Sequence, residues 1–99
     1  MQEHVKKSLM ANWGDKADAL DCFVPIKLID PVLNWACYIF AMNPDYQDIV
    51  SCVIVHGTDC EIYTLSLSYV LSSYNHEGEG PKVDDEFRTV HLSKILKSF

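Results

Sequence analysis

Two eight-residue segments of this chain, 35–42 and 49–56, have apolar side chains on both of their alternating faces. Such a segment is typical of a strand in the middle of a sheet whose two faces are both covered. The longest uninterrupted apolar run is the first of them, far below the ~20 residues that span a bilayer. In that segment we assign one face to Trp35, Cys37, Ile39 and Ala41, and the other to Ala36, Tyr38, Phe40 and Met42.

Further strands are expected on both sides of this pair. The segment 22–29 reads as a strand with Val24, Ile26 and Leu28 on one face. Because Pro25 has no N–H to donate, we expect this strand to lie at an edge or to be bulged. Tight-turn residues 57–59 predict a hairpin that leads into a fourth strand over 60–65, and a fifth strand is expected around 87–90.

Three helices and several loops complete the prediction. Apolar residues spaced for one helix face predict a helix over 2–13, a short one capped by Ser66, and one that begins near Leu92. The Ser66-capped helix would bury a stripe made of Leu67, Val70, Leu71 and Tyr74, and the last helix a stripe made of Leu92, Ile95, Leu96 and Phe99. Turn residues predict loops over 15–21, 30–34, 43–48 and 75–82.

These elements predict a single α+β domain over residues 1–99. Its sheet would be an antiparallel β-meander of four to five strands with two to three short helices. Ninety-nine residues suit one domain with one modest core. Three short helices give little cover for a sheet that is apolar on both faces, which favours a homodimer.

The net charge of −6 is concentrated in the middle of the chain. Residues 28–81 contain no Lys or Arg, which argues against direct binding of nucleic acid through a basic surface. A surface with negative charge only would attract a basic protein partner. The alternative is that the acidic residues only keep the protein soluble. The candidate partner-binding residues are the seven carboxylates of this stretch: Asp30, Asp45, Asp48, Asp59, Glu61, Glu77 and Glu79.

A meander would divide these carboxylates between the two ends of the sheet. Asp30, Asp59 and Glu61 are expected near one end, and Asp45 and Asp48 near the other, so that two patches form rather than one strip. Glu77 and Glu79 lie on a loop that the sequence does not place.

The four cysteines are expected to be reduced and mostly buried. The first ten residues lack the apolar core of a secretory signal, so we expect a cytoplasmic protein without disulfides or a membrane segment. Cys52, His56 and Cys60 have a spacing that invites a zinc site. Four residues along a strand span roughly 13 Å, too far for two ligands of one zinc ion, so no metal is expected.

No pattern of a known catalytic site is present. The acidic run 84–86 alternates between the faces of a strand and reads as a loop rather than a two-metal site. We therefore expect no enzyme and no cofactor, with a spatial Cys–His pair left open as a catalytic alternative. The aromatic residues Trp35, Tyr38, Phe40, Tyr63 and Tyr69 are expected to pack in the core rather than to stack bases.

Several residues spread along the chain form a pattern that resembles one protein family. They are Asn34, Trp35, Tyr38, Gly57, Glu61, Ser66, Leu67, Asp85 and Phe87. The pattern resembles short proteins of unknown function that plasmids and other mobile elements encode, over about residues 22–96. Cys37 stands where that family has an aromatic, and the family's Glu in the Ser-Leu helix is missing. The resemblance implies an α+β fold and a phage or mobile-element origin, without a reaction or cofactor.

Three classes of function remain. The first is a non-enzymatic interaction module, in one form a phage or mobile-element inhibitor of a nucleic-acid-binding host defence complex, of the anti-restriction or anti-CRISPR type. Size, acidity and the resemblance support it. The second is a self-associating structural or adaptor domain. The third is a small Cys/His enzyme or metal protein.

Overall fold

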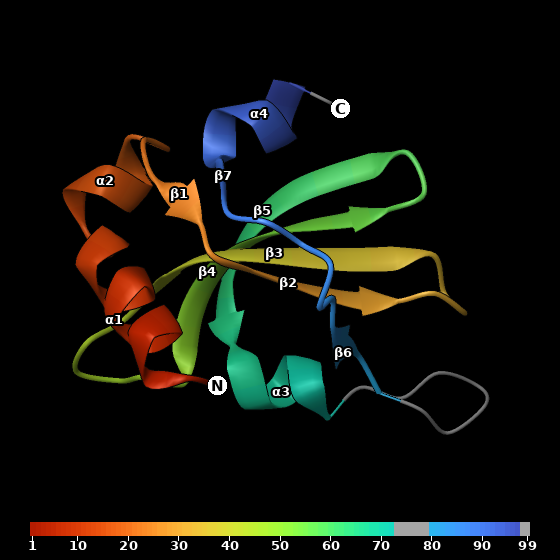
Figure 1. Cartoon of the computed structure of the whole chain (residues 1–99), viewed down its shortest axis with the longest axis horizontal. Helices are drawn as coiled ribbons and strands as arrows, with labels where there is room; N and C mark the ends of the chain where they lie inside the picture. The colour runs from red at the N-terminus through yellow and green to blue at the C-terminus, as the bar shows by residue number, and fades with distance from the viewer. Residues whose placement is uncertain (73–79, 98–99) are drawn as a thin grey trace.

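The computed structural model describes residues 1–72 and 80–97. Within them lie four helices and seven strands (Figure 1). The helices are α1 (Glu3–Asn12), α2 (Asp15–Asp18), α3 (Leu67–Leu71) and α4 (Leu92–Lys97). The strands are β1 (Phe23–Val24), β2 (Ile26–Asp30), β3 (Trp35–Met42), β4 (Ile49–His56), β5 (Asp59–Ser66), β6 (Lys82–Val83) and β7 (Val90–His91).

The main sheet is an antiparallel meander. Its strand order is β5-β4-β3-β2-β6, and a separate two-stranded sheet joins β1 to β7. The α+β class and the meander predicted from the sequence are confirmed. Strands β3 and β4 begin and end at the predicted residues, because alternating apolar residues on both faces suit only the centre of a covered sheet.

A β-bulge in β3 changes which face its last residues occupy. The register with β4 shifts between Ile39 and Ala41, so Phe40 is an extra residue in the ladder. Phe40 and Ala41 therefore both pack on one side of the sheet, while Ile39 and Met42 pack on the other. The predicted faces of Ala41 and Met42 were wrong, because one inserted residue inverts the alternation beyond it.

The segment 22–29 is two strands rather than one. Pro25 separates them, and β1 pairs with β7 while β2 pairs with β3 and β6. Val24 and Leu28 consequently pack on opposite sides of the main sheet, and their predicted common face was wrong. The strand expected at 87–90 is reduced to β7, and the fifth strand of the main sheet is β6.

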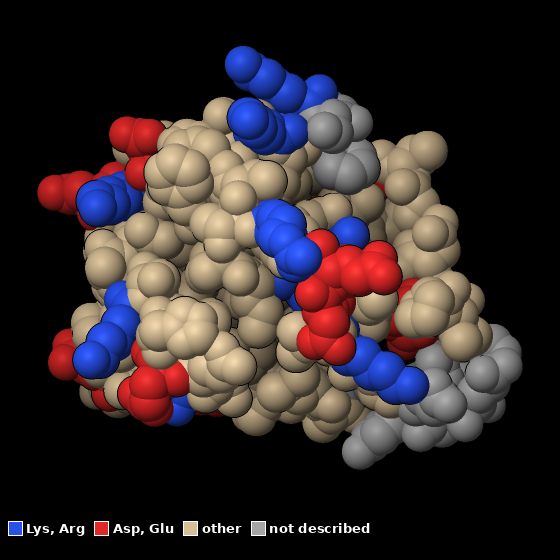
Figure 2. Space-filling view, viewed as in Figure 1, with Lys and Arg blue, Asp and Glu red and all other residues tan. Residues whose placement is uncertain are grey.

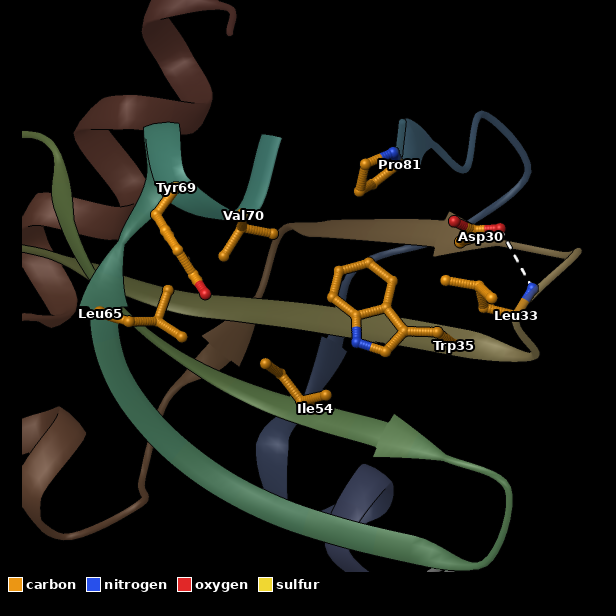
Figure 3. A pocket seen from close by; sticks show the side chains of 8 residues that line it. All are labelled: Asp30, Leu33, Trp35, Ile54, Leu65, Tyr69, Val70 and Pro81. Atoms are coloured by element: carbon orange, nitrogen blue, oxygen red, sulfur yellow. Dashed lines mark hydrogen bonds between the residues drawn. The ribbon is translucent and has the colours of Figure 1, made fainter. Parts of the chain in front are cut away.

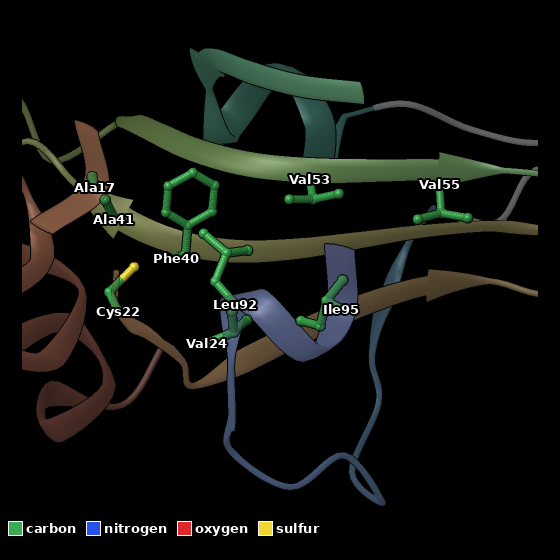
Figure 4. Packing of buried hydrophobic residues seen from close by; sticks show 9 residues of the cluster. All are labelled: Ala17, Cys22, Val24, Phe40, Ala41, Val53, Val55, Leu92 and Ile95. Carbon is green, nitrogen blue, oxygen red and sulfur yellow. The ribbon is translucent and has the colours of Figure 1, made fainter. Parts of the chain in front are cut away.

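Each face of the main sheet is covered by two helices of the same chain. On one face Leu92 and Ile95 of α4 pack with Phe40 and Val53, as Figure 4 shows, and α2 adds Ala17. The residues of the other cluster include Leu9 of α1 and Val70 of α3. The core strands β2 to β4 thus need no second subunit to cover them, whereas β5 is largely exposed.

Asn12 connects α1 to the bulge. Its Nδ2 donates to the backbone oxygens of Phe40, at 2.9 Å, and of Phe23, at 3.0 Å. Asn12 is buried. A buried carbonyl at an irregular point of a strand needs a donor from elsewhere, and this side chain supplies it.

The remaining helices and loops agree with the prediction in most respects. Ser66 caps α3, since its hydroxyl accepts a hydrogen bond from the N–H of Tyr69. The polar connection 15–21 contains the single-turn helix α2, which was not predicted. Tyr74, Phe99 and most of the loop 75–82 lie outside the described residues. Among the described helices none is long and apolar enough to cross a membrane.

Candidate functional site

One end of the main sheet carries a surface hollow that is both aromatic and acidic. It has a volume of about 250 Å³ and is named here the Trp35 hollow. Its lining residues come from β3, β4 and β5: Trp35, Ile54, His56, Asp59, Glu61 and Tyr63. Strand pairing brings them together, because Trp35 lies opposite His56, His56 opposite Asp59, and Ile54 opposite Glu61.

A second pocket adjoins the Trp35 hollow and shares Trp35 and Ile54 with it. Its volume is about 290 Å³. Figure 3 shows the Trp35 indole in the middle, with Leu65 and Tyr69 toward one side and Asp30 and Leu33 toward the other. This pocket is mainly apolar and continues the surface from the hollow toward α3. Trp35 therefore lines both the hollow and this neighbouring pocket.

The carboxylates at this end are held in defined positions. Asp30 closes the β2–β3 hairpin, where its Oδ1 accepts hydrogen bonds from the N–H groups of Val32, at 3.1 Å, and Leu33, at 3.2 Å. The hydroxyl of Tyr63 donates to Oε2 of Glu61. This hydrogen bond and the charge of Glu61 raise the pKa of Tyr63. Glu61 is thus oriented at the rim of the hollow.

The charged side chains that line these two depressions are of one sign. Among the residues that the structure describes, no Lys or Arg lines the Trp35 hollow or the pocket beside it. Three carboxylates do: Asp30, Asp59 and Glu61. A concave surface with carboxylates at its rim and aromatic faces inside suits an organic cation.

The candidate residues of the acidic stretch separate into two groups, as expected for a meander. Asp59 and Glu61 line the hollow and Asp30 lines the pocket beside it, while Asp45 and Asp48 lie in the loop between β3 and β4 at the opposite end of these strands. Glu77 and Glu79 lie outside the described residues. The structure therefore brings together only the first group around a depression.

The face of the molecule in Figure 2 is not uniformly acidic. Lys and Arg side chains lie beside Asp and Glu side chains in separate groups, with uncharged surface between the groups. Lys27 Nζ lies 3.6 Å from Asp84 Oδ2 and 5.2 Å from the ring centroid of Tyr38. Negative charge that can attract a partner is thus local to particular sites.

The cysteines are free thiols that belong mainly to the core. Cys22, Cys37 and Cys52 are buried, and Cys60 is half-buried. The pKa of Cys37 is raised, first by its hydrogen bond with Cys52 and then by burial. In the described part of the chain no group of three or more His, Cys, Asp or Glu residues could hold a metal ion. Of the three residues whose spacing invites a zinc site, Cys52 is buried, Cys60 is half-buried and His56 is exposed.

His91 forms a hydrogen-bonded chain that the sequence did not indicate. Its Nε2 lies 2.9 Å from Asp21 Oδ1, and its Nδ1 lies 2.8 Å from the Ser93 hydroxyl and 3.2 Å from the Ser93 nitrogen. Because the Ser93 N–H donates to Nδ1, the neutral imidazole carries its proton on Nε2 and donates it to Asp21. Its position directly before α4 identifies this imidazole as a cap of that helix.

Two aromatic side chains lie elsewhere than predicted. Tyr63 and Tyr69 are 41% and 72% exposed, whereas the sequence placed them in the core. Tyr63 is on β5, the outer strand, and Tyr69 is on α3. A signal was available for Tyr63, because β5 alternates apolar with polar residues only weakly and carries two carboxylates.

A scan against protein-family models and searches of curated proteins and of solved structures find no match to this chain. The resemblance to a mobile-element family therefore remains a prediction.

Proposed function

We propose that this protein is a non-enzymatic interaction module that binds a basic segment of a partner protein, with an arginine side chain in the Trp35 hollow. One observation carries this proposal: Trp35, Tyr63, Asp59 and Glu61 line the same depression without a cation among the described lining residues. Electrostatic complementarity of this kind speeds encounter and selects the partner.

Arginine fits this lining better than lysine does. Its guanidinium is planar, stacks on aromatic faces, and donates two parallel hydrogen bonds to a carboxylate. Tyr63 occupies Oε2 of Glu61, and among the described residues Oε1 has no partner. A cation over a tryptophan face contributes about 0.5–1 kcal/mol at an exposed site and ~2 kcal/mol when desolvated. Lysine would offer a point charge without the stacking plane.

An inhibitor of a nucleic-acid-binding host defence protein is the form of this function that we favour. Arginines that contact phosphates on such a protein would be the groups that enter the hollow. The small size, the acidic middle of the chain and the resemblance to mobile-element proteins support this form. Anti-restriction and anti-CRISPR proteins are examples of the class, which acts in the cytoplasm.

The test is a fluorescence titration with an acetylated hexa-arginine peptide. Trp13→Phe in every variant leaves Trp35 as the reporting indole. We expect Asp59→Asn with Glu61→Gln to weaken binding at least about tenfold, the effect of ~1.4 kcal/mol. The matched control, Asp15→Asn with Asp18→Asn, removes the same charge from the surface of α2 and should have little effect. Equal losses in both variants, or no binding by the parent protein, would refute the proposal.

The inhibitor form has its own test. A partner captured from the native host should release a bound nucleic acid when the protein is added, as measured by fluorescence anisotropy of the labelled strand. The Asp59→Asn, Glu61→Gln variant should release much less. If the captured partner keeps its nucleic acid with the parent protein as well as with the variant, the inhibitor form is refuted. The proposal of an interaction module would still stand.

A further inference from the structure

Within residues 1–72 and 80–97, the outer strand β5 has one long edge that pairs with no other strand. It pairs with β4 through eight consecutive residues without a register shift, and it is the last strand of the sheet. The outer strand at the other side, β6, has only two residues. Ile62 and Tyr63 in the middle of β5 are 46% and 41% exposed and point to opposite faces of the sheet.

In the described part of the chain, this edge has little of the usual protection against strand pairing. Natural outer strands are blunted by short length, by charged residues and above all lysine, by proline, by a bulge or by a covering segment. β5 contains no proline and no lysine, and it keeps a regular register throughout. Its only charges, Asp59 and Glu61, both lie in its first half.

Backbone groups of alternate residues in β5 face outward. Gly57 has a φ of +62°, as a two-residue type II′ turn requires at its first position, and His56 pairs with Asp59 across it. The pair that flanks such a turn is hydrogen-bonded, and bonded and non-bonded pairs then alternate along the hairpin. The N–H and C=O groups of Cys60, Ile62 and Thr64 therefore point away from β4.

We propose that a second copy of this chain pairs antiparallel with this edge, with Ile62 opposite Ile62 of the second copy. The two sheets then form one continuous ten-stranded sheet about a two-fold axis. In this register Glu61 lies opposite Tyr63 of the second copy, the same two residue types that form a hydrogen bond within the chain. Cys60 lies opposite Thr64 of the second copy, so the outward backbone groups meet.

The charge pattern of β5 favours a second copy over other extended segments. Antiparallel self-pairing places the acidic first half of one strand against the uncharged second half of the other, with Asp59 opposite Leu65 of the second copy. Like charges then never lie directly opposite each other. This proposal is independent of the binding of a basic partner, although the two-fold axis would bring both Trp35 hollows to one face of the joined sheet.

The experiment combines sedimentation equilibrium with hydrogen exchange on the full chain. We expect a concentration-dependent dimer in which the amides of Cys60, Ile62 and Thr64 become protected as concentration rises. Ile62→Lys should weaken dimerisation at least about tenfold, because like charges meet on the axis. Gln47→Lys, on the exposed β3–β4 loop, adds the same charge and should leave the dimer intact.

Two outcomes would overturn this inference. One is a monomer at every concentration, and the other is a dimer whose Ile62 amide exchanges as fast as in dilute protein. If the Ile62→Lys variant fails to fold, hydrogen exchange in the unmodified protein still tests the proposal. Raised salt separates the two proposals, since it should weaken arginine-peptide binding but not strand pairing.

Discussion

The carboxylate of Asp48 accepts a hydrogen bond from the hydroxyl of Ser66 and thereby joins the β3–β4 loop to the start of α3. The same carboxylate accepts from the backbone N–H of Ser68 at 2.8 Å and from its hydroxyl at 2.9 Å. The backbone oxygen of Asp48 accepts from the N–H of Leu67 at 2.7 Å. Both Asp45 and Asp48 are exposed, but the carboxylate of Asp48 also holds the junction of β5 and α3.

The stability of this junction should depend on acid pH. The three hydrogen bonds from Ser66 and Ser68 lower the pKa of Asp48. A carboxyl whose pKa is lower when folded stabilises the protein above its unfolded-state pKa, about 3.9, and loses that effect as pH falls through the folded pKa. We expect Asp48→Asn to reduce the free energy of unfolding at pH 7, with a difference from the parent that vanishes toward pH 2. Urea denaturation at a series of pH values measures this, with Asp45→Asn as the control.

The buried amide of Asn12 should be costly to remove. Asn12→Ala leaves the carbonyls of Phe23 and Phe40 without this donor, and an unsatisfied buried group costs about 1–3 kcal/mol. Asn12→Asp should destabilise further, because a carboxylate would face two carbonyl oxygens. Urea unfolding of these variants beside Lys7→Ala, an exposed position of α1, gives the comparison. Equal stability of Asn12→Ala and Lys7→Ala would contradict the role of Asn12.

The hydroxyl of Tyr63 should ionise at unusually high pH. Its pKa is raised because the phenol donates to Glu61 and because the phenolate would be repelled by that charge. Glu61→Gln should move the titration of this one tyrosine toward the ordinary value of about 10. The difference in absorbance at alkaline pH between each protein and its Tyr63→Phe counterpart isolates this group from the other tyrosines. An unchanged titration in Glu61→Gln would show that the two side chains do not interact in solution.

The Trp35 hollow should distinguish arginine from lysine. We expect a hexa-arginine peptide to bind several-fold more tightly than hexa-lysine of the same charge, since only guanidinium stacks on the indole. Trp35→Leu should reduce this preference while keeping the weaker charge attraction. Isothermal titration calorimetry with both peptides measures the two affinities without an optical reporter. Identical affinities in the parent protein would point to a simple charged surface.

The candidate site was predictable only in part. The grouping of Asp30, Asp59 and Glu61 at one end follows from the order of strands and turns, which the sequence pattern predicts. The hollow and the pocket beside it were not predicted, because the exposure of Tyr63 in the first and of Tyr69 in the second depends on which strand lies at the edge and on how α3 packs. For Asp48, sequence predicts a surface carboxylate and only the fold shows that Ser66 lies beside it.

The sequence alone determined strands β3 and β4, the Ser66 cap and the α+β class. These features depend on the alternation of apolar residues and on side chains within a few positions of each other. Tertiary structure decided the bulge at Phe40, the division of segment 22–29 between two sheets and the depth of the Trp35 hollow. Each of these depends on contacts between residues far apart in the chain, such as Asn12 with Phe40. Local pattern fixes which face of a strand is apolar, but only packing decides what covers that face and which side chains remain accessible to a partner.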